Sequence, residues 1–183
     1  MTSTTTTEAV NDIKVVDGYF VIPPKSWSEI LPNLYQGGTC DEDIIRKGGV
    51  KPEITSEDFQ FVVTAYPHAM PIGNNDGRAD MFLELRVPFG DSHIAHAPMP
   101  SVIQAAKSAY SAWNNGLKTL IRCQAGMNRS GLITALVLVK HGMDVDDAIS
   151  LIREKRHHLA LYNASYTDWL RANAVQVMRK EAQ

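Results

Sequence analysis

The stretch IRCQAGMNRSG, residues 121–131, holds a cysteine, an arginine and a hydroxyl close together around one glycine. The short apolar run before Cys123 predicts a strand that ends at this cysteine, and residues 130–142 predict a buried helix stopped by Gly142. The segment between them must turn sharply, and Gly126 permits the backbone angles that such a turn needs. The sequence therefore predicts a strand, a tight loop and a helix in direct succession.

The predicted loop has the chemistry of an anion site. Backbone N–H groups of a tight turn can converge on one centre, and the following helix adds unpaired N–H groups and a positive dipole end. Arg129, at the predicted start of the helix, can donate two hydrogen bonds to two oxygens of a bound group. This combination suits a phosphate dianion, and the residues expected to bind it are Gln124, Ala125, Gly126, Met127, Asn128 and Arg129.

Cys123 lies in the positive electrostatic field of the helix N-terminus and Arg129, and it is the candidate nucleophile. A thiol at a helix N-terminus beside an arginine ionises more readily than a free thiol, and a thiolate under a phosphate can attack it. Ser130 could donate its hydroxyl hydrogen to the sulfur and make it a better leaving group. The structural alternatives are a buried inert thiol for Cys123 and a plain first-turn hydroxyl for Ser130. The stretch lacks the G-K-[ST] of a nucleotide-binding loop.

The order of the flanking segments predicts the fold class. Strands are expected at residues 59–66, 81–89 and 117–123, and helices at residues 101–113, 144–156 and 165–180. The last two helices carry expected caps at Asp144 and Ser165. Strands and helices that alternate, followed by helices alone, indicate an α/β protein with a central, mostly parallel sheet flanked by helices and a helical C-terminal part.

If the bound group is an aryl or alkyl phosphate, its leaving oxygen needs a proton, and Asp91 is the residue expected to donate it. The strand ending near Val87 and the strand ending at Cys123 are joined by one helix, so their carboxyl ends meet at the same edge of the sheet. Open α/β sheets bind ligands at that edge. Asp91 lies on a loop between Gly90 and Pro98, from which it could overhang the anion pocket and move as a lid. The alternative is an aspartate that serves the turn after Gly90.

The length of the chain suits one core. Its 183 residues, 44% of them hydrophobic, are enough for one sizeable core and too few to require two. We expect residues 1–18 to form a disordered, threonine-rich tail and residues 19–183 to form a single domain. Within it, residues 19–38 predict short edge strands closed by a glycine pair, and residues 41–49 predict a short helix.

The bulk charge disfavours nucleic acid as a partner, since a net charge of −2 and a pI of about 6.3 leave no broad basic surface. No apolar run is long enough to span a membrane, and the N-terminal MTSTTTTEAV lacks the character of a secretory signal. Two cysteines make no disulfide scaffold, so Cys40 is expected to be an ordinary thiol rather than a redox partner of Cys123. We therefore expect a cytoplasmic protein with no membrane partner, and favour a monomer.

The segment CQAGMNRSG, which starts at Cys123, resembles the C-x5-R-[ST]-G signature of cysteine-dependent protein tyrosine phosphatases. Its Ala-Gly pair and the stretch LPNLYQGG are similar to the dual-specificity branch of that family. Asp91 stands 32 residues before the cysteine, as the general acid of that branch does. GMDVDDAISLIREKR, followed by Asn163 and Tyr166, resembles its late helices. The resemblance covers roughly residues 19–175.

This resemblance implies a phosphatase catalytic domain in residues 19–183 and a role for each matching residue. Cys123 would attack phosphorus and form a phosphocysteine, and Asp91 would protonate the leaving oxygen and then activate water. Arg129 and the loop would stabilise the transferred group, and Ser130 would help to release the sulfur. The implied substrates are phosphotyrosine and phosphoserine or phosphothreonine in proteins. The resemblance implies no cofactor and no metal.

Two positions depart from the family pattern. Arg122 stands where the family commonly has a histidine that orients the loop. Tyr162 stands before Asn163, where the family usually has a proline. Arg122 and Asn163 are both candidates for supporting the loop.

Other functions remain open at the level of sequence. An RNA 5′-triphosphatase also has the Asn-Arg pair in its loop, whereas a phosphoinositide phosphatase is expected to carry loop lysines, and QAGMN has none. A phosphate-binding module without catalysis would be expected to lack one of the catalytic residues. His93 and His96 are too few to predict a metal site. The run REKRHH, residues 153–158, predicts a solvated helix end.

Overall fold

The computed structural model describes residues 14–16, 20–23, 25–39, 58–69 and 83–179 of the chain. The described strands are β1 (Lys14–Val16), β2 (Phe20–Ile22), β3 (Trp27–Leu31), β4 (Leu34–Gly38), β5 (Phe61–Thr64), β6 (Leu83–Arg86) and β7 (Thr119–Cys123). The described helices are the short 3-10 helix η2 (Ile94–His96) and the α-helices α2 (Met99–Asn114), α3 (Arg129–His141), α4 (Val145–Lys155) and α5 (Ala164–Arg179). β1 pairs with β2 in a separate antiparallel ribbon.

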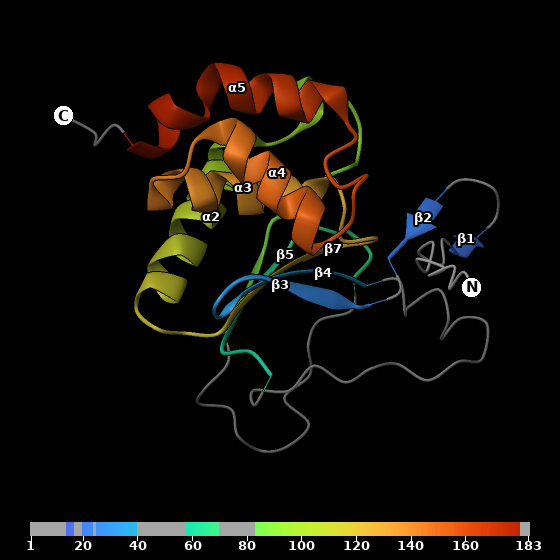
Figure 1. The fold of residues 1–183 in the computed structure, drawn as a ribbon, viewed down its shortest axis with the longest axis horizontal. Helices are drawn as coiled ribbons and strands as arrows, with labels where there is room; N and C mark the ends of the chain where they lie inside the picture. The colour runs from blue at the N-terminus through green and yellow to red at the C-terminus, as the bar shows by residue number, and fades with distance from the viewer. Residues whose placement is uncertain (1–13, 17–19, 24, 40–57, 70–82, 180–183) are drawn as a thin grey trace, which may run out of the picture.

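A five-stranded sheet with the order β3-β4-β7-β5-β6 forms the centre of the fold (Figure 1). Within this sheet β3 and β4 pair antiparallel, whereas β4-β7, β7-β5 and β5-β6 are parallel. The predicted α/β class with a mostly parallel sheet is therefore confirmed. Because β7 lies between β4 and β5, its last residue, Cys123, reaches the middle of the carboxyl edge, opposite Gly38 in β4.

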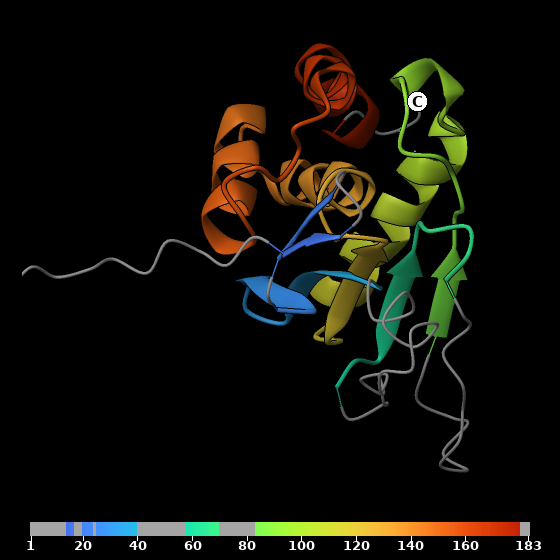
Figure 2. The ribbon, with the colours of Figure 1, turned by 90° about the vertical axis from the view of Figure 1, so that its right-hand side faces the viewer.

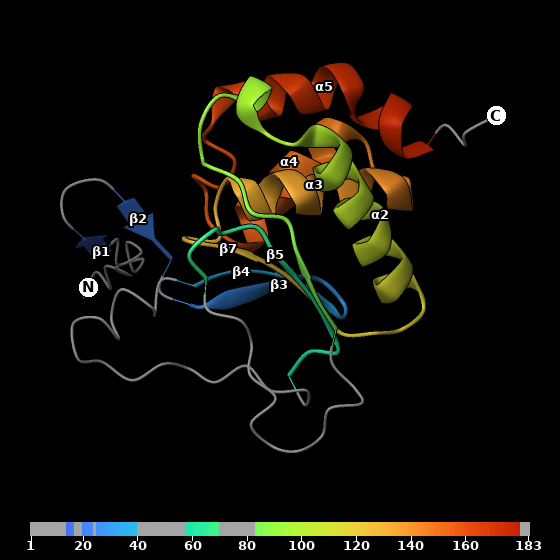
Figure 3. The same ribbon diagram turned by 180° about the vertical axis from the view of Figure 1, so that it is seen from behind.

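The four described α-helices gather on one face of this sheet, as the views in Figures 1, 2 and 3 agree. α3 lies at their centre, and its residues from Arg129 to Val139 are buried. This burial follows from its sequence, since a helix that is apolar on all sides must be covered on all sides. A smaller apolar cluster of Phe59, Val62 and Leu120 lies apart from this core. Leu120 points away from the helices because it alternates with Ile121 along β7.

The four predicted helices that lie within the described residues are confirmed. Asp144 is the N-cap residue of α4, as predicted, whereas the predicted cap at Ser165 is wrong. Gly142 ends α3 in the left-handed region, with φ of 114°, as expected of a C-terminal glycine. Asp144 precedes α4 in extended backbone, but its side chain makes no capping hydrogen bond. At α5 the cap is Asn163 rather than Ser165, because the Oδ1 of Asn163 accepts the backbone N–H of Ser165 at 3.2 Å.

The prediction of edge strands in residues 19–38 is wrong for β4, which pairs on both sides. The expected closing glycines, Gly37 and Gly38, lie inside this strand rather than after it. A Cβ atom on Gly38 would lie 2.7 Å from the carbonyl oxygen of Gln124, so a glycine is needed where the loop after β7 crosses β4. The predicted helix at residues 41–49, Cys40, and all of the expected tail except β1 lie outside the described residues.

We expect Gly38→Ala to lower the free energy of unfolding by about 1–3 kcal/mol, because the methyl group must displace backbone atoms of the loop. Denaturant unfolding measures this change. Gly90→Ala is the matched control, since its Cβ would meet nothing closer than Ser92 Oγ at 3.8 Å. Equal stability of the two variants would contradict the close packing of loop and strand.

Candidate active site

The end of β7 and the start of α3 bring the thiol and the hydroxyl together. Cys123 is 2% exposed, and its Sγ lies 3.3 Å from the Oγ of Ser130. The two residues are separated in the chain by the predicted loop, in which Gly126 takes a left-handed φ of 70°. The turn predicted from the glycine therefore folds the chain back so that the serine hydroxyl can reach the sulfur.

Two side chains that no sequence pattern indicated, those of Arg156 and Gln36, hold the loop from outside. The Nε and Nη2 of Arg156 donate to the carbonyl oxygens of Gly126 and Ala125 at 3.1 and 3.2 Å. The Nε2 of Gln36, in β4, donates to the same Gly126 oxygen at 3.0 Å. In a trans peptide the N–H points opposite to the C=O, so these bonds turn the N–H groups of Gly126 and Met127 away from Arg156.

The prediction of a solvated helix end for residues 153–158 is therefore wrong at Arg156, which is buried. Arg156 follows α4 directly and is only 6% exposed. It also donates to the carbonyl oxygen of Lys25 at 2.7 Å, which joins the segment before β3 to the loop. Nothing in the run REKRHH distinguishes this arginine from the charged residues beside it, because the burial of Arg156 depends on where β3 and the loop pack.

Arg129 opens α3, and contacts from several segments hold its guanidinium in place. It is 5% exposed, its Nη1 donates to the carbonyl oxygen of Phe89 at 3.0 Å, and its guanidinium carbon lies 5.1 Å from the centroid of the Tyr66 ring. Its Nη2 reaches the Oε1 of Gln124 at 3.4 Å. Its buried Nε–H has no hydrogen-bond partner within the described part of the chain. A buried donor left without a partner is costly, and a bound oxyanion would satisfy it.

Asp91 meets the loop through two amides. Its Oδ2 accepts from the Nδ2 of Asn128 at 3.0 Å, and its Oδ1 accepts from the Nδ2 of Asn163 at 3.3 Å. The two asparagines are themselves joined, since the backbone N–H of Asn163 donates to the Oδ1 of Asn128 at 3.1 Å. The structure thus brings the predicted acid to the predicted loop, with Asn163 between them.

The sequence of residues 50–176 matches the family described as dual specificity phosphatase, catalytic domain. The chain belongs to this family. The match spans most of the chain and includes the strand, the loop and the helices that form the site. The resemblance read from the cysteine signature is therefore confirmed at the level of the family.

Solved structures of dual specificity phosphatases and related proteins share the fold. Human DUSP28 has a TM-score of 0.64 at 16% identity, with 87% of this chain and 99% of that chain covered. Tk-PTP in its active form has a TM-score of 0.63 at 19% identity, covering 84% and 99%. PTPMT1 has a TM-score of 0.62 at 17% identity, covering 84% and 96%. No curated protein sequence matches the chain.

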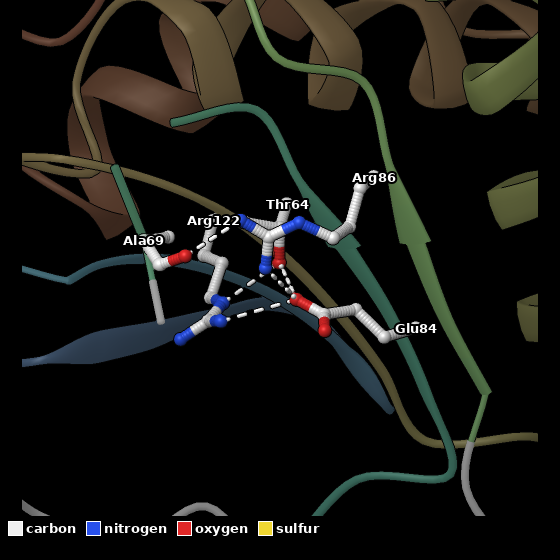
Figure 4. A network of polar contacts seen from close by, with 5 residues as sticks. All are labelled: Thr64, Ala69, Glu84, Arg86 and Arg122. Atoms are coloured by element: carbon white, nitrogen blue, oxygen red, sulfur yellow. Dashed lines mark hydrogen bonds and ion pairs between the residues drawn. The ribbon is translucent and has the colours of Figure 1, made fainter. Parts of the chain in front are cut away.

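Arg122, the departure from the family pattern, lies behind the phosphatase loop. It is 1% exposed, and its Nε donates to the Oγ1 of Thr64 at 2.8 Å while its Nη2 lies 3.2 Å from the Oε1 of Glu84 (Figure 4). Because side chains alternate along β7, Arg122 points to the opposite face of the sheet from Cys123. These two contacts anchor the strand that ends at Cys123, on the face opposite to that cysteine.

Tyr166 buttresses the chain just before Asp91. Its hydroxyl donates to the carbonyl oxygen of Gly90 at 3.2 Å. Burial, reinforced by the Asp91 carboxylate, raises the pKa of Tyr166 to about 12. The phenol therefore remains a hydrogen-bond donor at neutral pH, and this contact does not change in the pH range in which Asp91 would act.

No metal centre is evident in the described part of the phosphatase. No group of three or more His, Cys, Asp or Glu side chains there is placed to hold an ion. His93 instead caps η2, where its Nδ1 accepts the N–H of Ala95 at 3.2 Å. In the same residues no helix is both long and apolar enough to cross a membrane.

We expect Arg156→Met to weaken binding of inorganic phosphate at least about tenfold, because hydrogen bonds from a charged donor each contribute about 1.5–3 kcal/mol. Isothermal calorimetry with phosphate measures the affinity. The matched control is Arg179→Met, since Arg179 donates in the same way to the carbonyl oxygens of Val139 and Met143, away from the loop. A loss of phosphate affinity equal in both variants would argue against the bracing role.

Asn163 combines two contacts that substitution can separate. Asn163→Asp keeps the oxygen that caps α5 but replaces the amide donor with a second negative charge beside Asp91. We expect its stability to stay near wild type while kcat on an aryl phosphate falls about tenfold, part of the 10²–10⁴ that a general acid provides. Asn163→Ala should lose the cap as well, at about 1 kcal/mol. Thermal unfolding and steady-state kinetics of the two variants, compared side by side, decide this.

Proposed function

We propose that the protein hydrolyses phosphate monoesters of tyrosine and of serine or threonine in other proteins, through a phosphocysteine intermediate. The observation that carries this proposal is the buried Arg129 Nε–H without a partner, next to a thiol that contacts a serine hydroxyl. Membership of the dual specificity phosphatase family supports the same chemistry. The proposed setting is a cytoplasmic monomer whose partner is the phosphorylated substrate.

In the first step the Cys123 thiolate attacks phosphorus, the S–P bond forms and the bond to the leaving oxygen breaks. Asp91 gives its proton to that oxygen, so the product leaves as a neutral alcohol or phenol. Arg129 and the N–H groups of the loop hold the three other oxygens as charge develops on them. The contacts of Asp91 with Asn128 and Asn163 support this role, because they keep the carboxyl at the loop.

In the second step a water molecule attacks the phosphocysteine, and Asp91 takes its proton. The S–P bond breaks, and the electron pair returns to sulfur as a thiolate. The Ser130 hydroxyl can donate to this sulfur, since the two atoms already lie 3.3 Å apart. Inorganic phosphate then leaves, and no step requires a cofactor or a metal ion.

An aromatic side chain at the rim supports aryl phosphates among the substrates. Tyr162 is 55% exposed, and its backbone is fixed on both sides. The N–H of Leu161 donates to the carbonyl oxygen of Met127 at 3.3 Å, and the N–H of Asn163 donates to Asn128. Partial burial and the Asp91 carboxylate raise the pKa of Tyr162, which is consistent with a ring near the acid. Such a ring could pack against the ring of phosphotyrosine.

We expect hydrolysis of para-nitrophenyl phosphate to survive EDTA, to disappear in Cys123→Ser, and to fall about 10²–10⁴-fold in Asp91→Asn. Release of nitrophenol measures turnover, and phosphate binding by Cys123→Ser shows that the loop is intact. Asp91→Asn keeps the size of the side chain and one of its two acceptor oxygens, so it removes the proton and at most one of the two contacts with Asn128 and Asn163.

A substrate panel then separates the alternatives. Phosphotyrosine and phosphoserine peptides should be turned over faster than a phosphoinositide or a 5′-triphosphorylated RNA. A preference for either of the last two would replace the protein substrate by a lipid or an RNA. Phosphate binding without turnover of any substrate would contradict catalysis and leave a phosphate-binding module.

A further inference from the structure

A carboxylate behind the nucleophile joins three strands. Glu84, in β6, has a side chain only 11% exposed, and its Oε1 contacts three donors from three strands (Figure 4). The Oγ1 of Thr64 lies at 2.6 Å, the Nη1 of Arg86 at 3.1 Å and the Nη2 of Arg122 at 3.2 Å. Thr64 and Arg122 are neighbours in the pairing of β5 with β7, and Thr64 and Arg86 in that of β5 with β6.

The first route from this carboxylate leads to the nucleophile. Arg122 immediately precedes Cys123. The two residues that its side chain contacts, Thr64 and Glu84, are largely buried. The carbonyl oxygen of Arg122 accepts the N–H of Ala65 at 2.8 Å. Arg122 is thus fixed by its side chain and its backbone, so the position of the following Cα in β7 depends on the network.

The second route leads to the arginine that binds phosphate. Arg86 touches Glu84 through Nη1 and donates through Nη2 to the carbonyl oxygen of Ala69 at 2.6 Å. This bond closes the turn after β5. The turn carries Tyr66, against whose ring the guanidinium of Arg129 lies at 5.1 Å. One carboxylate is therefore connected to both groups that must meet the same phosphorus.

We infer that Glu84 is a positioning residue for catalysis, which acts through Arg122 and Arg86 to hold Cys123 in register with Arg129. It touches no substrate, because it faces the opposite side of the sheet. The inference rests on the proposed function, since register between thiol and guanidinium matters where a phosphoryl group is transferred. Misplacement of a reacting group by about 1 Å can cost about 10²-fold in rate.

Glu84→Gln tests this, because it keeps the size and one acceptor oxygen but removes the charge that pairs with two guanidinium groups. We expect kcat on para-nitrophenyl phosphate to fall about 10- to 100-fold, with KM changed less than about threefold. The matched control is Asp146→Asn, which removes the exposed ion pair with Arg171 at 2.9 Å and should stay within about twofold of wild type.

A second readout needs no turnover. Iodoacetate carries a carboxylate that Arg129 and the N–H groups of the loop between β7 and α3 can attract to Cys123, whereas iodoacetamide is neutral. We expect Glu84→Gln to lower the ratio of the iodoacetate rate to the iodoacetamide rate about fivefold or more. A misplaced Arg129 would lose its charge-assisted hydrogen bond to the carboxylate of iodoacetate, and such a bond is worth at least about this factor. Arg122→Met should lower it similarly, and in the double variant the two losses should not multiply, since both break one network.

The outcomes separate this inference from the proposed function. A wild type that hydrolyses no phosphate ester overturns the proposed function, while the alkylation ratio still tests positioning. A Glu84→Gln variant that keeps both kcat and the alkylation ratio overturns positioning even if hydrolysis is established. A lower melting temperature with both kinetic readouts unchanged at a temperature where the variant is folded also overturns it, because Glu84 would then serve stability alone.

Discussion

The candidate active site depends on which donors form hydrogen bonds with the carbonyl groups of the loop between β7 and α3. A loop that binds a dianion must turn its N–H groups inward, and its carbonyls must then find donors outside. Arg156 and Gln36 supply these donors from two distant segments. The absence of a side chain at Gly38 lets the loop approach β4 closely enough for Gln36 to reach it. The geometry of the candidate site is therefore a consequence of hydrogen bonds to the backbone of the loop.

The acid is tied to this loop by the same kind of connection. Asn128 belongs to the loop, Asp91 follows β6 and Asn163 caps α5, yet the three side chains form one hydrogen-bonded group. Asn163 contributes twice, since it also fixes where α5 begins. Asn163 thus contributes both to the start of a helix and to the position of Asp91, which explains how a late segment of the chain influences a site built largely by earlier ones.

The sequence predicted the parts of this site whose chemistry is local. Cys123, Gly126, Arg129 and Ser130 lie in one short segment, and the pattern of apolar runs around it predicted the sheet and the helices. Asp91 could be inferred because the crossover between parallel strands has a fixed outcome. Arg156 could not, because a buried arginine and a solvated one have the same sequence neighbourhood. The predicted cap at Ser165 is wrong for a related reason, since the exact start of a helix depends on how the chain enters it.

Arg122 shows how a departure from the family pattern can be accommodated by the fold. A histidine at this position can be buried neutral, but an arginine keeps its charge and needs a buried anion close by. Glu84 provides that anion, and the small hydroxyl of Thr64 fills the space between the two strands. A charged pair that stabilises little by itself still fixes geometry, because hydrogen bonds between a guanidinium and a carboxylate have a defined direction. Where the family pattern has a histidine before the cysteine, this chain therefore has an ionic network that involves Arg122, Glu84 and Thr64.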